Sequence, residues 1–373
     1  MKISFILPVA SMGGGTKVVA IYAKALAEKG HDVVLISPPP GNIPLRRKIK
    51  SLVTGRGWPS HSQPKSHLDG LGLDHRVLDR WRPVTDADVP DSDVVIATWW
   101  ETAEWVGTLS DSKGAKVYFI QGHEVHKHIP VERSRATYYL PLHKIVISKW
   151  LQNIMRTEYG DEDVDLVPNS VDHSQFYSDL RGKQPVPTVG FLYSRSISVK
   201  GIDTTMEAIK RLRVTFPNLR VIAFGAYKPE EAIVSFDNQI DFYCAPEQDR
   251  IRNIYGQCDV WLTASRTEGF NLPAMEAMAC RTPVVSTKTG WPEEAVVTGK
   301  NGVLVDVDDV EALTNGAASI LSLTDEAWQR MSNNAYETVA TSAWQDSSNQ
   351  FEKALERAIL RSRSPGNVQR PKS

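Results

Sequence analysis

Short apolar runs alternate with amphipathic stretches along most of the chain. Between the first two runs, residues 17–29 are predicted to form a helix, because their apolar side chains recur at helical spacing. Runs of strand length that alternate with helices indicate βαβ units and a buried parallel sheet. The runs predicted as strands in the first half are Ile3–Leu7, Asp32–Ile36, Val94–Thr98, Val117–Gln121, Lys144–Ile147 and Val164–Val167.

The alternation stops at residues 181–187 and then begins again. These residues are polar, include Pro185 and Pro187 and have no periodicity, so they are predicted to be a linker. Helical patterns continue to about Arg361, and residues 362–373 form a polar, basic tail that is expected to be flexible. The predicted strands after the linker are Val189–Leu192, Arg220–Phe224, Ile240–Tyr243, Val260–Thr263, Pro283–Ser286 and Val303–Val305, and the predicted helices include Thr204–Val214, Asp249–Tyr255 and Pro273–Cys280.

Two doubly wound α/β domains are the expected architecture. We expect a first Rossmann-like domain over residues 1–180 and a second over 188–342, which agrees with a chain of 373 residues and domains of about 100–200 residues. A further helix is expected over 343–361, with a return to the first domain as one option. In open parallel sheets, ligands bind beyond the carboxyl ends of the strands, so chemistry is expected in the loops that follow strands.

Charge, cysteine content and hydropathy exclude several classes of protein. The 43 Lys and Arg residues against 44 Asp and Glu give a net charge of −1, so no nucleic-acid partner is expected. The three cysteines form no Cys-x-x-Cys pair, which argues against disulfides or structural zinc and fits the cytoplasm. No apolar run approaches the roughly 18 residues of a membrane span, and the N-terminal run is too short for a signal peptide. The composition carries no sign of an oligomeric state.

Three glycines, Gly13, Gly14 and Gly15, follow the first predicted strand. Glycine lets the backbone approach a ligand closely, and the next helix offers free N–H groups to an anion. The dinucleotide fingerprint G-x-G-x-x-G fails, because its third glycine would fall on Val18 and no acidic residue ends the second strand. A nicotinamide enzyme is therefore disfavoured, and a tight turn without a ligand stays an alternative.

Two glutamates border the helix predicted at 273–280. Glu268 lies in the preceding loop and Glu276 about one turn into the helix, so the helix dipole favours the ionised form of both. A carboxylate accepts two hydrogen bonds and suits the vicinal hydroxyls of a sugar, whereas solvated glutamates are the plainer alternative. Pro273 suits the first helical position. The backbone N–H groups available to a phosphate or sugar oxygen are those of Gly269, Phe270, Asn271 and Leu272.

Two cations, Arg195 and Lys200, flank the turn after the predicted strand Val189–Leu192, where another helix begins. A pair of fixed cations beside the start of a helix can clamp a diphosphate and stabilise a departing phosphate. Taken alone, the two side chains are more simply explained as solvated surface cations.

These segments resemble the retaining glycosyltransferases of family four, the group-one transferases with the GT-B fold. Glu268 to Glu276 resembles their E-x7-E motif, and Arg195 with Lys200 and the following glycine resembles their R-x4-K-G element. The glycine loop and the segments 168–172 and 278–285 also match, so the resemblance covers nearly the whole chain. The sequence departs from the family where relatives often carry glycine, at Ser170, Asn271 and Arg281.

The resemblance implies two Rossmann-like domains that face a central crevice, with the nucleotide-sugar donor on the second and the acceptor on the first. It implies transfer of a hexose, with retention, to a sugar or lipid-linked glycan in polysaccharide or glycoconjugate biosynthesis, without a cofactor. Glu276 would bind the ribose and Glu268 the sugar hydroxyls. Arg195 and Lys200 would bind the diphosphate with the backbone of Gly14 and Gly15, which makes Arg195, Lys200 and Glu268 catalytic candidates.

Three histidines lie within six residues after the predicted strand Val117–Gln121. The metal motif H-E-x-x-H fails because Lys127 stands at its fifth position, and no metal is expected. The family usually places a histidine here, close to the donor sugar, so His123 is the candidate catalytic residue, and Gln121 and Glu124 are weaker candidates for the acceptor. A solvated loop is the alternative.

Tryptophan is enriched, with 10 residues, and Trp99, Trp100 and Glu101 end one predicted strand. An aromatic face stacks on sugar C–H groups and a carboxylate holds hydroxyls, so these three are acceptor candidates, with core packing an equal alternative. The basic stretch Arg46–Lys50 either contacts an anionic surface, such as the inner face of the membrane or a phosphorylated lipid acceptor, or is a solvated loop.

Two rival functions stay open. An epimerase or phosphorylase on the same fold would act without a distinct acceptor, and a non-catalytic protein would only bind a nucleotide sugar or glycan. The joint presence of Arg195, Lys200, Glu268 and Glu276 favours the transferase, because a non-catalytic relative would be free to lose them.

Overall fold

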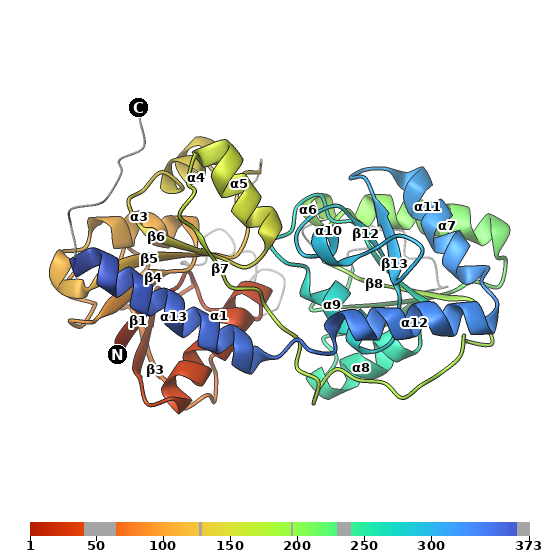
Figure 1. The fold of residues 1–373 in the computed structure, drawn as a ribbon, viewed down its shortest axis with the longest axis horizontal. Coiled ribbons are helices and arrows are strands. Elements are labelled where there is room, and N and C mark those ends of the chain that lie inside the picture. The colour runs from red at the N-terminus through yellow and green to blue at the C-terminus, as the bar shows by residue number, and fades with distance from the viewer. Residues whose placement is uncertain (41–64, 127–128, 195–196, 230–239, 364–373) are drawn as a thin grey trace, which may run out of the picture. The chain divides into compact units, whose positions relative to one another are not determined.

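The computed structural model contains two α/β units, each built on its own parallel sheet (Figure 1). It describes residues 1–40, 65–126, 129–194, 197–229 and 240–363. The first unit comprises Met1–Val146, Met155–Val167 and the chain from Ser348 onwards, and the second comprises Ile147–Ile154 and Pro168–Ser347. The expected class, two parallel-sheet Rossmann-like domains, is confirmed.

Within the described residues, the sheet of the first unit has seven parallel strands in the order β3-β2-β1-β4-β5-β6-β7. The order reverses between β1 and β4, so the loops after these two strands leave the same edge of the sheet side by side. The strands are β1 (Lys2–Ile6), β2 (Asp32–Ser37), β3 (Asp74–Val77), β4 (Val94–Ala97), β5 (Ala115–Ile120), β6 (His143–Val146) and β7 (Asp165–Leu166). Only β3, which is short and half exposed, was not expected from the hydrophobic pattern.

The described sheet of the second unit has six parallel strands in the order β10-β9-β8-β11-β12-β13. Its order reverses between β8 and β11, whose following loops carry Lys200 and Glu268. The strands are β8 (Thr188–Leu192), β9 (Arg220–Gly225), β10 (Ile240–Cys244), β11 (Val260–Thr263), β12 (Val284–Thr287) and β13 (Gly302–Val305). Its helices are α6 (Ile197–Lys200), α7 (Ile202–Thr215), α8 (Gln248–Gly256), α9 (Leu272–Ala279), α10 (Pro292–Ala295), α11 (Val310–Leu321) and α12 (Asp325–Val339).

The long C-terminal helix completes the core of the first unit. From Ser348 onwards, α13 (Trp344–Arg363) belongs to that unit, and its Phe351 stacks on Tyr22 with ring centroids 4.5 Å apart. At the same helix, Glu352 accepts hydrogen bonds from Lys29 and pairs with His31, each at 2.6 Å. Among the described residues, the unit's other helices are α1 (Gly14–Glu28), α3 (Trp100–Thr108), α4 (Val131–Thr137) and the 3-10 turn η1 (Asp111–Lys113), while α5 (Lys149–Tyr159) contributes residues to both units.

Tryptophan side chains contribute to the largely aliphatic core of the second unit. Trp261 of β11 and Trp328 of α12 are fully buried, and Trp328 Nε1 donates to the carbonyl of Asp259 at 2.9 Å. A Cβ at Gly190 would lie 2.5 Å from the Trp261 ring, so the glycine in β8 makes room for the indole. Part of the tryptophan excess therefore serves packing.

Residues 181–187 differ from the expectation of a linker, because they are bonded to the second unit. Arg181 Nη2 donates to the carbonyl of Cys258 at 2.6 Å, and Lys183 Nζ donates to the carbonyls of Leu321 and Leu323. The division between the units falls at 167/168 instead. A polar segment that satisfies buried carbonyls has the same hydropathy as a solvated one, so its pattern does not distinguish the two.

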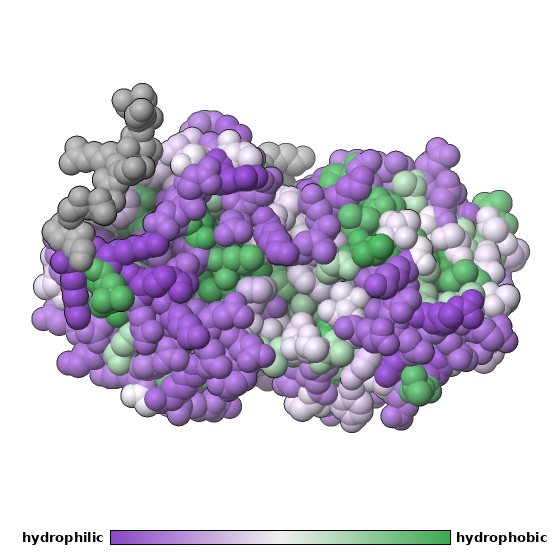
Figure 2. Space-filling model, in the orientation of Figure 1, coloured by the Kyte–Doolittle hydropathy of each residue, from purple (hydrophilic) through white to green (hydrophobic). Residues whose placement is uncertain are grey.

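The described helices include none that is both long enough and apolar enough to cross a bilayer. The face drawn in Figure 2 is mostly hydrophilic, with small separate hydrophobic groups. Arg46–Lys50 and the tail from residue 364 lie outside the described residues.

We expect Phe351→Ala to destabilise the first unit by about 3–5 kcal/mol, because the substitution leaves a cavity among the buried rings of Phe5, Tyr22 and Phe119. Urea unfolding followed by tryptophan fluorescence would measure the loss. Leu360→Ala, on the same helix but 65% exposed, is the control and should change stability by less than about 0.5 kcal/mol. Equal unfolding of the two variants would contradict the packing role of α13.

Candidate active site

In the second unit, the loops after β8 and β11 bring a lysine and a glutamate together. Lys200 ends α6, and its Nζ donates to Glu268 Oε1 at 2.7 Å. The hydroxyl of Ser265 donates to the same carboxylate oxygen, also at 2.7 Å. The Glu268 side chain is 11% exposed and that of Lys200 33%, so the pair is only partly screened by solvent. Two residues far apart in the sequence thus form one charged site.

The turn after Lys200 can lie this close to the β11 loop only because residue 201 is glycine. Gly201 has φ +58°, and a Cβ there would lie 1.9 Å from the carbonyl oxygen of Ala264. The carbonyl of Gly201 accepts hydrogen bonds from the backbone and the hydroxyl of Thr205 in the first turn of α7. In the pair Lys200-Gly201, the lysine therefore supplies the charge and the glycine allows the close approach of the two loops.

A second carboxylate lies on α9. Glu276 is buried, and its Oε2 accepts a hydrogen bond from the Tyr255 hydroxyl at 2.9 Å. Burial raises the pKa of Tyr255, and the neighbouring Glu276 charge raises it further, so the phenol stays protonated and donates. The carboxylate is held in one orientation.

The N-terminus of α9 leaves backbone donors next to Glu268. Asn271 precedes the helix with φ +76°, and its side chain donates to the hydroxyl of Thr263 rather than capping the helix. No side chain caps this helix start. Pro273 has no N–H and the N–H of Ala274 donates to the Asn271 carbonyl at 3.1 Å, so in the first turn the N–H of Leu272 is the donor suited to an anion. The helix begins at Leu272, so Pro273 is its second residue and not its first. Phe270 is buried against Trp291, so its side chain serves packing.

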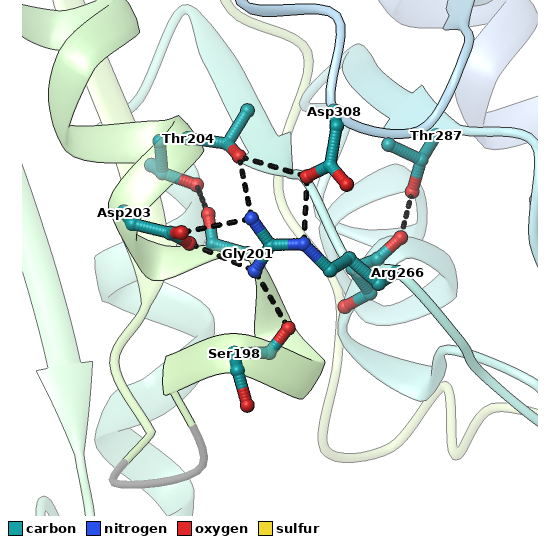
Figure 3. A network of polar contacts seen from close by, with 9 residues as sticks. Ser198, Gly201, Asp203, Thr204, Arg266, Thr287 and Asp308 are labelled. Carbon is teal, nitrogen blue, oxygen red and sulfur yellow. Dashed lines mark hydrogen bonds and ion pairs between the residues drawn. The ribbon is translucent and has the colours of Figure 1, made fainter. Parts of the chain in front are cut away.

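One residue of this site was missed from the sequence. Arg266 bonds to Ser198 and to Asp203 and Asp308, and Figure 3 shows its side chain lying between them. A single arginine in a loop looks like any solvated cation, and nothing in its spacing indicated these partners. Arg195, which was expected beside Lys200, lies outside the described residues.

The first unit has a pocket of about 250 Å³ at the carboxyl ends of β1, β4 and β5. It brings together four residues expected from the sequence, namely Gly15, Trp99, Gln121 and Glu124, with Ser11, Gly13, Thr16 and Tyr118. Gly14 and Gly15 lie in α1 without positive φ, and a Cβ at Gly14 would meet nothing within 4 Å. The backbone therefore does not require glycine here. The missing side chain of Gly14 leaves open space, whereas a Cβ at Gly15 would contact the Gln121 side chain at 3.7 Å.

Three other expected residues do not line this pocket. His123 Nε2 lies 2.7 Å from the Tyr159 hydroxyl, and its side chain is 13% exposed. Burial lowers the pKa of His123, and the nearby Glu158 raises it in part. Trp100 is buried with the Arg133 guanidinium 5.1 Å from its ring, which occupies the face that a sugar would need. Glu101 is half buried, and burial raises its pKa.

The loop that carries Glu124 is held by a tyrosine. The hydroxyl of Tyr138 accepts from the Glu124 N–H at 2.8 Å and donates to the Gly122 carbonyl at 3.2 Å.

Across the described ranges, no cluster of three or more His, Cys, Asp or Glu side chains is placed to hold a metal ion.

Comparison with known families agrees with this architecture. Residues 12–175 match the family model described as Glycosyltransferase Family 4, and residues 181–338 match the model described as Glycosyl transferases group 1. The chain belongs to the group 1 glycosyltransferases of the GT-B type, as the motifs had indicated.

Relatives with curated descriptions are distant. The chain is 25% identical over 204 residues to an uncharacterized glycosyltransferase, MJ1178, of Methanocaldococcus jannaschii, covering 54% of this chain and 55% of the relative. It is 26% identical over 215 residues to one subunit of the human phosphatidylinositol N-acetylglucosaminyltransferase, covering 56% and 44%. The chain thus spans about half the length of these relatives. Among solved structures, Anabaena Alr3699/HepE in complex with UDP is similar over 96% of this chain and 100% of that one, with a TM-score of 0.72 and 17% identity.

We expect Gly201→Ala to destabilise the second unit by more than the roughly 1–2 kcal/mol that a left-handed conformation costs, because its Cβ would also collide with Ala264. Gly299→Ala is the matched control: Gly299 has φ +81° and open space around its Cβ position. The urea midpoints of the two variants would separate the cost of backbone strain at positive φ, which both share, from the cost of the steric collision at residue 201. A larger loss for Gly299→Ala would contradict the close approach at Gly201.

Proposed function

We propose that the protein is a retaining glycosyltransferase that moves a hexose from a nucleotide diphosphate sugar to a sugar or lipid-linked glycan acceptor. The observation that carries the proposal is the Lys200–Glu268 pair beside the uncapped N-terminus of α9, with the oriented carboxylate of Glu276 on the same helix. A cation, backbone N–H groups and two carboxylates are the groups that a diphosphate and two sugar rings require.

The donor would exchange partners with the ion pair. Its diphosphate oxygens take the Lys200 ammonium and N–H groups of residues 269–272, which lead into α9, while sugar hydroxyls donate to Glu268 in place of that ammonium. Glu276 accepts hydrogen bonds from the ribose hydroxyls, while the Tyr255 hydroxyl continues to donate to Glu276 Oε2 and orients the carboxylate. When the donor separates Lys200 from Glu268, each of the two side chains gains a new polar partner, so no buried charge is left unpaired.

Departure of the diphosphate would be the step that the site accelerates. As the bond between the sugar and the diphosphate breaks, negative charge grows on the leaving phosphate oxygen, next to Lys200 and the helix N-terminus. Preorganised donors of this kind are worth roughly 3 kcal/mol each in other enzymes. The acceptor hydroxyl attacks the same face, and its proton passes to the leaving phosphate oxygen, so no side chain serves as the base.

For the acceptor, we propose the pocket of the first unit. Glu124 and Gln121 offer acceptors and donors to hydroxyl groups, and Trp99 offers an aromatic surface for sugar C–H groups. The His123 ring is engaged with Tyr159, so we assign it the positioning of this loop and not contact with the reacting atoms. The similarity to a protein solved with UDP supports a nucleotide-sugar donor.

We expect Glu276→Gln to lower kcat/KM for the donor about 10- to 100-fold, the loss typical of one charge-assisted hydrogen bond. Nucleotide release from UDP-, GDP-, ADP- and dTDP-sugars would first identify the donor and then compare the variants. Glu326→Gln, an exposed glutamate in the first turn of α12, is the control and should behave as the wild type. Unchanged turnover by Glu276→Gln would overturn the donor-site assignment. Mass spectrometry of the products separates a transferase from an epimerase or a phosphorylase.

We expect Glu124→Gln to raise KM for the acceptor about tenfold while binding of the donor is unchanged, because the side chains proposed to bind the donor, Lys200, Glu268 and Glu276, lie in the second unit. Glu162→Gln, at an exposed position of the same unit, is the control. Initial rates with varied acceptor at saturating donor would measure the effect. A change in donor affinity alone would assign Glu124 to the donor instead.

A further inference from the structure

The guanidinium of Arg266 has a partner for each of its five N–H groups (Figure 3). Nε donates to Asp308 at 2.6 Å. Nη1 donates to the Ser198 carbonyl at 2.6 Å and to Asp203 at 3.0 Å, and Nη2 donates to Asp203 at 2.8 Å and to the Thr204 hydroxyl at 3.5 Å. No donor of the group is left over for a substrate.

These contacts fix the separation of the two segments that carry the ion pair. Arg266 lies two residues before Glu268, and Ser198 lies two residues before Lys200. The backbone N–H of Arg266 also donates to the Val199 carbonyl at 2.9 Å, so main chain and side chain bind the same short helix. Asp308 adds a third segment, the loop between β13 and α11.

The short helix needs such support. α6 has four residues, and Gly201 interrupts the helix after Lys200. A single helical turn fixes several backbone dihedrals for very few hydrogen bonds, so it is unstable on its own. The position of Lys200 therefore depends on what holds α6 from outside.

We infer that Arg266 is a positioning residue of the donor site, which holds the turn carrying Lys200 at the distance from Glu268 that diphosphate binding requires. The role given to the diphosphate rests on the proposed function, whereas the hold on Lys200 does not. Lysine cannot replace the arginine, because its three donors sit on one atom and cannot reach Ser198, Asp203 and Asp308 together in one plane. The charge of Arg266 is balanced by Asp203 and Asp308, which leaves geometry as its contribution.

The test that needs no ligand is the reactivity of the Lys200 amine. Trace acetylation with acetic anhydride, read by peptide mass spectrometry, would compare Lys200 with Lys183, whose Nζ binds the Leu321 and Leu323 carbonyls in the same unit. In Arg266→Lys, which keeps the charge, we expect Lys200 to react at least about threefold faster relative to Lys183. Loss of the planar guanidinium loosens the pairing of Lys200 with Glu268 and exposes the Lys200 amine.

The matched control is Arg281→Lys. Arg281 lies in the same unit, donates to Asn333 at 2.7 Å and to the Ser178 carbonyl at 3.2 Å, and its guanidinium lies 4.2 Å from the Tyr336 ring. This variant also loses a guanidinium with several partners, but it should leave the ratio of Lys200 to Lys183 acetylation unchanged. An unchanged ratio in Arg266→Lys, or an equal rise in both variants, would overturn the inference.

A double-mutant cycle then tests whether the hold on Lys200 serves anion binding. With inorganic pyrophosphate as the probe in titration calorimetry, Arg266→Lys should bind about tenfold more weakly than the wild type. In a Lys200→Met background the same substitution should not weaken pyrophosphate binding further. A loss of affinity caused by general destabilisation would instead be equally large in both backgrounds. Additive effects would overturn the positioning role. Failure of the wild type to bind pyrophosphate would instead count against the donor site, with the acetylation result still deciding the hold on Lys200.

Discussion

The contact between Gly201 and the carbonyl of Ala264 is the constraint on which the proposed donor site depends. No side chain fits between them, so the loops after two adjacent strands are pressed together at the point where the strand order reverses. That approach puts the Lys200 ammonium 2.7 Å from the Glu268 carboxylate. The ion pair and the contacts of Arg266 with α6 both depend on this closeness. A larger residue at 201 would therefore disturb charge placement as well as packing.

Both units use their sheets in the same way. Parallel strands that are buried on both faces leave only their ends for polar chemistry. In each unit, candidate site residues follow the two strands at the reversal in strand order, and in the first unit Gln121 and Glu124 follow the neighbouring strand β5. In the first unit Gly14 leaves open space near the pocket, whereas in the second unit Gly201 allows two loops to come into contact. One residue type thus has two opposite uses, which the positive φ and the contacts of each glycine distinguish.

Much of the fold and part of the site could be predicted from the sequence. Alternating apolar runs located most strands to within one or two residues, and the spacing of Glu268 and Glu276 around a helix start located the carboxylates. The orientation of side chains could not be predicted, as His123 and Trp100 illustrate: both turn toward neighbours, Tyr159 and Arg133, that are distant in the sequence. Residues 181–187 were misplaced for a related reason, since their polar groups bind carbonyls of the second unit.

The sequence by itself determined the parallel α/β class, the loops that carry chemistry and the residue types that suit a diphosphate and sugar hydroxyls. These properties follow from local periodicity and motif spacing, which the order of residues contains directly. Only the tertiary structure decided which of those residues share a site, that Arg266 braces the ion pair, and that Phe351 of the last helix packs with β1 in the first unit. Each of these depends on contacts between segments tens to hundreds of residues apart, and such contacts are set by packing and strand order, not by local pattern.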